Sequence, residues 1–189
     1  MAFQGKLVVI SAPSGAGKTS IAREILRLNP SLSFSVSATT RSMRSGEADG
    51  KDYFFLTKDE FLKRVGAGEF VEWETIYGNY YGTLKAEVDR ALKNGQHLLF
   101  DVDVKGGLSI KRRYPEALTV FIRPPSLDIL QQRLRDRNTE DTTTLARRLE
   151  RVPMELEMGN AFEHQIVNDE LPRAIAEVQR IVQQHLQQS

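Results

Sequence analysis

Apolar runs alternate with segments of helical periodicity along most of this chain. The strand-like runs lie at residues 6–12, 97–103, 118–123 and 164–169. The helical patterns that follow them lie near residues 17–28, 104–113, 126–137 and 172–187. Strands that alternate with helices in this way form a parallel sheet with helices on both faces. The pattern therefore predicts an α/β fold.

The pattern changes in two places, which we interpret as inserts. Residues 32–95 contain short apolar runs separated by glycine-containing turns, which predicts a partly antiparallel sheet. One helix there is well marked, because Thr57 and Glu60 have the spacing of a capping box. The second insert, residues 134–151, is rich in charge and predicts a polar lobe. We expect both inserts to belong to a single domain.

Composition narrows the range of partners. Of the 189 residues, 40% are hydrophobic and 27% are charged, which is enough for one full core. The net charge is +1 with both signs interspersed, so we expect binding to neither nucleic acid nor membranes. The chain has no cysteine, and no apolar run approaches the roughly 20 residues that span a bilayer. We expect a soluble, cytoplasmic protein, for which the sequence leaves a homo-oligomer open.

The first apolar run leads into a loop of small residues. The stretch VVISAPSGAGKTS, residues 8–20, has the strand, glycine-rich loop and helix start of a P-loop. In such a loop backbone N–H groups point at phosphate oxygens, Lys18 bridges the β- and γ-phosphates, and the Thr19 hydroxyl binds Mg²⁺. Ala12 stands where the P-loop motif usually has its first glycine. The alternative to a P-loop is a glycine-rich turn followed by a solvated lysine. The residues expected to bind ATP are Ala12, Pro13, Ser14, Gly15, Ala16, Gly17, Lys18, Thr19 and Ser20.

A second set of polar residues has the chemistry of a phosphate clamp. Arg41 and Arg44 supply guanidinium groups that match phosphate oxygens, and the Tyr53 hydroxyl adds a hydrogen-bond donor. An ordinary solvated basic loop is the alternative. Carboxylates and hydroxyls that can converge on a base follow on neighbouring strands and turns: Glu72, Tyr81, Thr83, Asp101 and Asp103.

Together these stretches resemble the guanylate kinase family. The motifs SAPSGAGKT, SATTRSMRSGEADGKDYFF, FVEW, GNYYGT, DVDVKGG and IVND occur in order from about residue 6 onward. The resemblance implies a P-loop NTPase-like parallel sheet flanked by helices, with a mixed-sheet GMP-binding insert and a helical lid. It also implies Mg²⁺-dependent transfer of the γ-phosphoryl group of ATP to GMP or dGMP. The implied division is a core of residues 1–33, 96–133 and 152–189, a GMP-binding lobe of 34–95 and a lid of 134–151.

The resemblance also assigns roles around GMP. Four residues would hold its phosphate: Arg41, Arg44, Tyr53 and Tyr81. Glu47 would order the two arginines. Those that would read guanine are Ser37, Glu72, Thr83 and Asp103. The chemistry agrees, because a carboxylate accepts from guanine N1–H and the N2 amine, while a hydroxyl donates to O6. Adenine has the reverse pattern at position 6 and would leave buried polar groups unpaired.

Asp101 is a candidate for two neighbouring roles. It ends an apolar strand, as an acidic residue that holds Mg²⁺ through water would do. We also expect it close to GMP. The alternative is a plain aspartate at a strand end.

The charged insert supplies the remaining arginines. Arg133 and Arg137 lie one helical turn apart and therefore share a face. The resemblance implies that these two and Arg148 contact ATP and the transferred phosphate, and that Asn168 lies near adenine. The residues expected to carry the transfer are Lys18, Arg41, Arg137 and Arg148.

Two residues depart from the family pattern. A third residue, an aromatic one, is expected in the core because of its residue type. Asn138 stands where glycine is usual, and Pro153 lies inside an expected long helix, which it should kink or end. Both departures bear on the geometry of the lid. Trp73 is expected in the core.

Two other functions stay open at this point. A catalytically silent guanylate kinase-like domain would bind proteins, but Lys18, Thr19 and Asp101 are all present in this chain. A P-loop kinase of a phosphorylated sugar would have no use for Ser37 and Glu72 together. Both alternatives are therefore less consistent with the motifs than a nucleotide kinase is.

Overall fold

The computed structural model describes residues 5–76, 78–136 and 142–187. Two residues singled out above, Arg137 and Asn138, lie outside these ranges. The strands are β1 (Leu7–Ser11), β2 (Leu32–Phe34), β3 (Ala38–Thr39), β4 (Phe54–Phe55), β5 (Phe70–Ile76), β6 (Asn79–Leu84), β7 (His97–Asp101), β8 (Leu118–Arg123) and β9 (His164–Val167). The helices are α1 (Lys18–Leu28), α2 (Lys58–Gly66), α3 (Lys85–Lys93), α4 (Val104–Arg113), α5 (Leu127–Asp136), α6 (Thr142–Gly159) and α7 (Leu171–Gln187).

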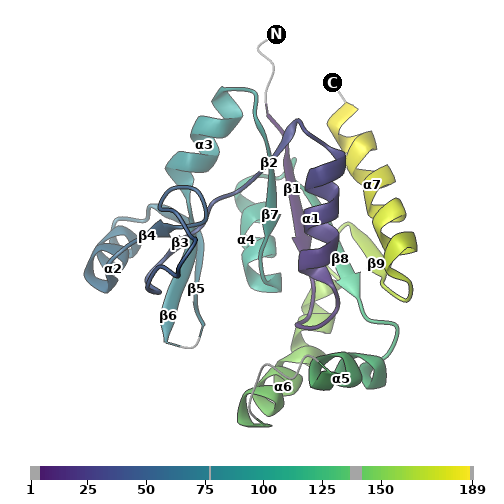
Figure 1. Ribbon diagram of the computed structural model, residues 1–189. Helices are drawn as coiled ribbons and strands as arrows, with labels where there is room; N and C mark the ends of the chain where they lie inside the picture. The colour runs from purple at the N-terminus through teal and green to yellow at the C-terminus, as the bar shows by residue number, and fades with distance from the viewer. Residues whose placement is uncertain (1–4, 77, 137–141, 188–189) are drawn as a thin grey trace.

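A five-stranded parallel sheet forms the core, in the order β2-β7-β1-β8-β9 (Figure 1). The central strand β1 is buried along its whole length. Ile10 of β1 is in register with Asp101 of β7 and with Val120 of β8. The carboxyl ends of these three strands therefore open at one edge of the sheet. The predicted α/β fold is confirmed.

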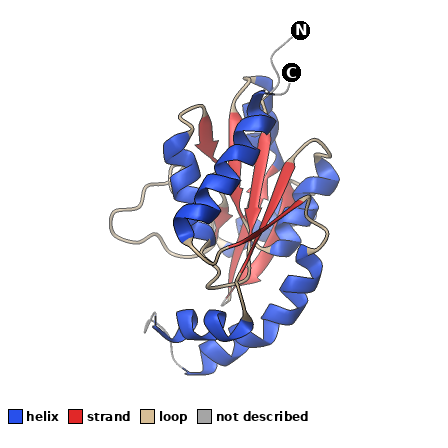
Figure 2. Cartoon of the chain, turned by 90° about the vertical axis from the view of Figure 1, so that its right-hand side faces the viewer, coloured by secondary structure: helices blue, strands red, loops and turns tan. Residues whose placement is uncertain are grey.

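Helices cover both faces of this sheet (Figure 2). On one face, Ile25 of α1 and Val178 of α7 pack in a cluster with Ile10. On the other face, Ile110 of α4 packs in a cluster with Val9. Neighbouring residues of a strand point to opposite faces, so β1 contributes to both clusters. The four helices expected from periodicity correspond to α1, α4, α5 and α7.

The second sheet has the order β4-β3-β6-β5 and forms, with α2, a small lobe of residues 38–84. β3 is parallel to β4, whereas β6 is antiparallel to both β3 and β5, which confirms a partly antiparallel insert. The capping box of α2 is also confirmed. Thr57 Oγ1 accepts the Glu60 N–H at 3.2 Å, and the Glu60 carboxylate accepts the Thr57 N–H at 2.9 Å.

The small lobe has an aromatic core of its own. The fully buried Phe61 of α2 stacks with Phe70 and Tyr80, at centroid distances of 4.4 and 5.4 Å. Trp73 contacts Phe61 edge-on but is 45% exposed, so its assignment to the core is only partly right. Trp73 lies on β5, an edge strand of the second sheet.

Helices α5 and α6 lie beyond the carboxyl ends of the core strands (Figure 1). α6 contains Pro153 and continues past it to Gly159, so of the two expected effects, a kink or an end of the helix, the proline does not end it. Val152 is buried and Leu156 packs against the core on either side of the proline. This apolar packing offsets the backbone hydrogen bond that a proline removes.

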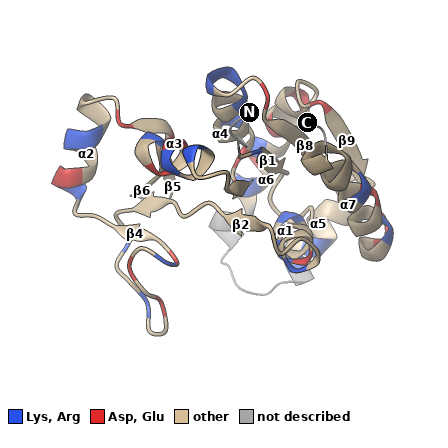
Figure 3. Cartoon of the chain, turned by 90° about the horizontal axis from the view of Figure 1, so that it is seen from above, with Lys and Arg blue, Asp and Glu red and all other residues tan. Residues whose placement is uncertain are grey.

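Charged residues of both signs share the helices that face solvent (Figure 3). This distribution agrees with the small net charge of +1. Among the helices that the structure describes, none combines the length and the apolar character needed to cross a membrane.

Candidate nucleotide-binding and phosphoryl-transfer site

The P-loop connects the carboxyl end of β1 to the start of α1. Gly15 and Gly17 have φ values of 89° and 98°, a conformation that strongly favours glycine. A Cβ on Gly15 would lie 2.9 Å from the Leu134 side chain, so space also requires glycine there. Gly17 caps α1 and brings no side chain to its first N–H groups. These N–H groups are therefore available to phosphate oxygens, as the sequence predicts.

Lys18 and Asp101 meet at the end of the core sheet. The Lys18 ammonium forms an ion pair with the Asp101 carboxylate and donates to Val102 O at 3.1 Å. The two residues are 83 positions apart in sequence, but β1 and β7 are neighbours in the sheet. The exposed Thr19 follows Lys18 at the start of α1. The structure thus brings the expected phosphate-binding and metal-binding groups to one edge.

Asn168 supports the P-loop from the side. Its buried side-chain amide donates to Ala16 O at 2.8 Å, and a Cβ on Gly17 would collide with that amide. Arg133 Nη2 in turn donates to Asn168 O at 3.0 Å. Both residues expected near ATP therefore lie beside the P-loop, where Asn168 contacts its backbone directly.

A cleft of about 460 Å³ lies between the P-loop, α6 and β5. We call it the phosphate cleft. Arg148 of α6 lines it and donates from Nη1 to Ser14 Oγ at 2.9 Å. The other expected lid arginine, Arg137, lies outside the described residues. The lining residues are Ala12, Pro13, Ser14, Gly15, Gly17, Lys18, Thr19, Glu74, Thr75, Ile76, Asp103, Arg148, Arg151 and Glu155; Ala16 and Ser20 are not among them.

The arginine clamp belongs to the loop between β3 and β4. Glu47 holds the Arg41 guanidinium by two hydrogen bonds, at 2.7 and 2.9 Å, and accepts the Arg44 backbone N–H at 2.7 Å. These bonds lower the pKa of Glu47 to about 2. The expected ordering role of Glu47 agrees with this geometry. The Arg44 side chain is exposed, and its backbone is what Glu47 holds.

Aromatic rings surround the fixed guanidinium of Arg41. Arg41 Cζ lies 5.2 Å from the Tyr53 ring centroid and 5.7 Å from that of Phe55. Tyr81 packs edge-on against Tyr53 at 6.1 Å. Burial raises the pKa of Tyr53, and the Arg41 guanidinium opposes the rise. Arg41 and the two tyrosines expected at the phosphate thus lie together.

Glu72 and Thr83 form a polar pair on adjacent strands of the small lobe. Thr83 Oγ1 donates to Glu72 Oε1 at 2.6 Å, and Thr83 is almost fully buried. Burial raises the pKa of Glu72 to about 7, and the hydrogen bond from Thr83 opposes the rise. Ser37, the other expected guanine contact, precedes β3, and its carbonyl accepts the Phe54 N–H at 2.9 Å.

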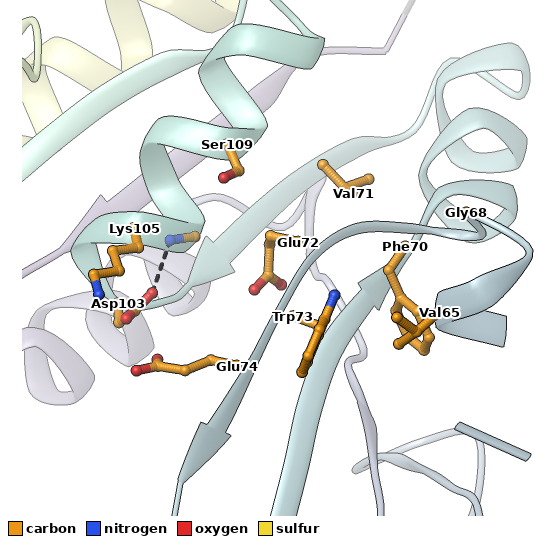
Figure 4. A pocket seen from close by; sticks show the side chains of 11 residues that line it. Val65, Gly68, Phe70, Val71, Glu72, Trp73, Glu74, Asp103, Lys105 and Ser109 are labelled. Carbon is orange, nitrogen blue, oxygen red and sulfur yellow. Dashed lines mark hydrogen bonds between the residues drawn. The ribbon is translucent and has the colours of Figure 1, made fainter. Parts of the chain in front are cut away.

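Asp103 caps helix α4. Its Oδ1 accepts the Gly106 N–H at 2.8 Å, while its Oδ2 is buried and has no hydrogen-bond partner among the described residues. Glu72 and Glu74 of β5 point to the side on which Asp103 lies (Figure 4). These carboxylates border a groove of about 390 Å³ between α4 and β5. The expected guanine-reading acids Glu72 and Asp103 thus face each other across this groove.

Comparison with known proteins places the chain in a family. The family model described as guanylate kinase matches residues 4–185. The guanylate kinase of Chlorobaculum tepidum is 47% identical over 98% of this chain and 95% of its own length. That of Symbiobacterium thermophilum is 44% identical over 95% of this chain and 85% of its own. The chain belongs to the guanylate kinase family.

A solved structure from the same family has the same fold. The crystal structure of guanylate kinase from Anaplasma phagocytophilum aligns with a TM-score of 0.76 and 27% identity, over 99% of this chain and 89% of that one. The resemblance noted from the motifs is confirmed. The family relatives favour neither the protein-binding module nor the sugar kinase.

Several residues of the site were missed by sequence reasoning. A Cβ on Gly106 would lie 3.0 Å from Asp103 and 3.1 Å from Glu72, so this glycine leaves room for both carboxylates. Glu74 lies two residues from Glu72, and that spacing alone places it on the same face of a strand. Arg151 and Glu155 line the phosphate cleft on α6, and nothing local in the sequence separates them from the charged residues around them.

Proposed function

We propose that this chain transfers the γ-phosphoryl group of ATP to GMP or dGMP, giving ADP and GDP or dGDP. One observation carries the proposal. The pair formed by Glu72 and the buried Thr83 matches the donors of guanine and lies in the same lobe as the Arg41 clamp. This lobe borders the phosphate cleft. Residues that can bind a purine base and residues that can bind its phosphate thus lie beside a P-loop, which suits a purine monophosphate as the acceptor.

On the donor side, we assign the ATP phosphates to the P-loop and the start of α1. When ATP binds, the Lys18 ammonium would give up its hydrogen bond to Val102 O and bind the β- and γ-phosphates instead. The phosphates carry more negative charge than the Asp101 carboxylate with which Lys18 is paired. Arg148 already reaches the loop through Ser14 and would contact the transferred group. These cations would stabilise the charge that spreads over the phosphoryl oxygens during transfer.

On the acceptor side, Arg41, Tyr53 and Tyr81 would bind the GMP phosphate. Ionised Glu72 would accept hydrogen bonds from guanine N1–H and the N2 amine, and the Ser37 hydroxyl would donate a hydrogen bond to O6. We expect no general base, because the second pKa of a phosphate monoester is about 6 and its oxygens are already ionised near neutral pH. The protein thus orients a nucleophile that the substrate itself supplies.

We also propose Mg²⁺ as the cofactor. The donors present suit it, since Mg²⁺ takes one or two protein oxygens together with phosphate oxygens and water. Thr19 offers a hydroxyl at the start of α1, and Asp101 offers a carboxylate at the end of β7. The ion would neutralise charge on the β- and γ-phosphates.

We place the activity in the cytoplasm and take nucleotides as its partners. ATP and GMP are highly charged and do not cross a bilayer unaided. Nothing in the small net charge of +1 favours nucleic acid as a partner.

A coupled assay of ADP release tests the proposal. The acceptors to compare are GMP, dGMP, AMP, CMP, UMP and a sugar phosphate, each with ATP and Mg²⁺. We expect rapid turnover with the two guanine nucleotides only. Turnover with the sugar phosphate, or with no acceptor in the panel, would contradict the proposed function.

A further inference from the structure

Arg151 of α6 lies among three carboxylates from three parts of the molecule. Its Nη2 donates to Glu74 Oε1 of the small lobe at 2.9 Å and lies 3.7 Å from Asp103 Oδ2 at the start of α4. Its Nε lies 3.4 Å from Glu155 Oε1 on its own helix. One guanidinium thus joins β5, α4 and α6.

The partners of Arg151 are poorly hydrated. The side chains of Glu74, Asp103 and Glu155 are 23%, 21% and 10% exposed. Burial raises the pKa of Glu74 to about 7, with Asp103 adding to the rise, and it also raises the pKa of Glu155. In both cases Arg151 opposes the rise. Without this cation, the carboxylates would repel one another beside a cleft that must accept phosphates.

Arg151 also completes a connection between the two sides of the site. It lies three residues after Arg148 on α6, so the two side chains share one face of the helix. Arg148 binds Ser14 of the P-loop, whereas Arg151 binds Glu74 of the small lobe. The same helix turn therefore contacts both the donor loop and the acceptor lobe.

We propose that Arg151 is a positioning residue for the acceptor nucleotide. By binding Glu74 it holds the small lobe against α6, and by lying beside Asp103 it keeps that carboxylate directed at guanine. The part of the proposal that concerns guanine rests on the proposed function. The contact between the small lobe and α6 does not, because it joins two residues of the protein itself.

This ion pair differs from the surface pairs elsewhere in the molecule. Arg151 and Glu74 are 77 residues apart and bridge two structural units. Arg90 and Glu87, by contrast, are three residues apart on α3, and their side chains are 66% and 34% exposed, against 41% and 23% for Arg151 and Glu74. Exposed local pairs contribute little to stability, whereas a partly buried pair between units restrains their relative position. Arg90 therefore provides a matched control.

Kinetics provide the first test. We expect Arg151→Met and Glu74→Gln each to raise KM for GMP about three- to tenfold and to leave kcat within about twofold. Arg151→Lys keeps the positive charge, so its KM for GMP should be close to that of the wild type. The double variant should be no worse than Arg151→Met alone, because the two residues act as a pair. Arg90→Met should match the wild type.

Distance measurement provides the second test and needs no activity. The chain has no cysteine, so Lys63→Cys on α2 and Glu150→Cys on α6 can be spin-labelled specifically. Without nucleotide, we expect one narrow distance distribution, which Arg151→Met and Glu74→Gln both broaden and Arg90→Met leaves unchanged. Circular dichroism checks that each variant is folded.

The outcomes separate the alternatives. Unchanged distances together with an unchanged KM in both variants would overturn the proposal. A lower kcat at constant KM would also overturn it, since Arg151 would then act on the transferred phosphate. If the wild type failed to phosphorylate GMP, the proposed function would fail and with it the guanine part of the inference. The distance distributions would then still decide whether Arg151 holds the small lobe.

Discussion

The donor and acceptor sides of the cleft are built in different ways. The P-loop lies between a fully buried strand and a helix, and Asn168 holds its backbone at Ala16. The acceptor side has strands of two residues at β3 and β4, and side-chain pairs such as Arg41 with Glu47 define its geometry. The hydrophobic core of the main sheet therefore sets the donor geometry. On the acceptor side, an ion pair fixes the clamp, and the small aromatic core supports the strands that carry Glu72 and Thr83.

This difference has a functional consequence. A rigid backbone cradle suits a triphosphate, whose phosphates look alike in every nucleotide. Recognition of one base depends on polar side chains that form hydrogen bonds with the correct base. The wrong base would leave these side chains without hydrogen-bond partners. We therefore expect changes on the donor side to alter kcat, and changes on the acceptor side to alter specificity, KM and pH dependence.

The largest effect is expected from Lys18→Met on the donor side. Loss of the ammonium should lower kcat by about a thousandfold or more, because we propose that Lys18 stabilises charge on the transferred group. GMP affinity should stay within about twofold, since Lys18 lies outside the acceptor lobe. Turnover and calorimetry of GMP binding measure the two quantities. Turnover equal to that of the wild type would remove the P-loop from the mechanism.

Two acceptor-side changes should separate base from phosphate recognition. Glu72→Ala removes a charged acceptor for two donors, so kcat/KM for GMP should fall about ten- to two-hundredfold, with a much smaller fall for AMP. Arg41→Ala should lower kcat/KM for GMP and AMP alike, because the proposed role of Arg41 is to bind the phosphate that both share. Steady-state kinetics with both nucleotides measure this. Equal losses for GMP and AMP in a folded Glu72→Ala protein would make Glu72 a structural residue.

The pH dependence should sharpen the same contrast. Burial raises the pKa of Glu72 to about 7, and only its ionised form accepts from guanine. Between pH 8 and pH 6, the kcat/KM for GMP should therefore fall about tenfold more than that for AMP, whose phosphate titrates in the same way. The ratio of the two values at each pH is the measurement. A ratio that does not change with pH would contradict a titrating Glu72 at the base.

The smallest effect concerns stability. In the folded protein Glu72 keeps its proton up to about pH 7, whereas the unfolded chain loses it near 4.5, so ionisation of this residue favours unfolding as the pH rises through that window. Glu72→Gln should accordingly raise Tm by about 2–5 °C at pH 8 and by much less at pH 4. Thermal unfolding at the two pH values measures this. An equal shift at both would show that the gain is unrelated to ionisation.

Most of the fold was predictable because its signals are local. The buried strands of the core sheet are apolar runs, the capping box of α2 is a spacing of three residues, and the P-loop joins a strand directly to a helix. Each depends on residues that are neighbours in sequence. Trp73 and Pro153 were judged by residue type alone, and both outcomes depended on the segments packed against them.

The candidate site divides along the same line. The motifs were enough to name Lys18, Arg41 and Glu72, because backbone geometry and hydrogen-bonding chemistry restrict which residue types work there. They did not reveal that α6 lies near β5, where Arg151 reaches a glutamate 77 residues away. Such a contact depends on how helices and sheets pack, and packing sums many weak apolar contacts between distant segments. Sequence alone therefore specified the chemistry of the two substrates, and the tertiary structure decided which charged residues hold the two sides of the cleft together.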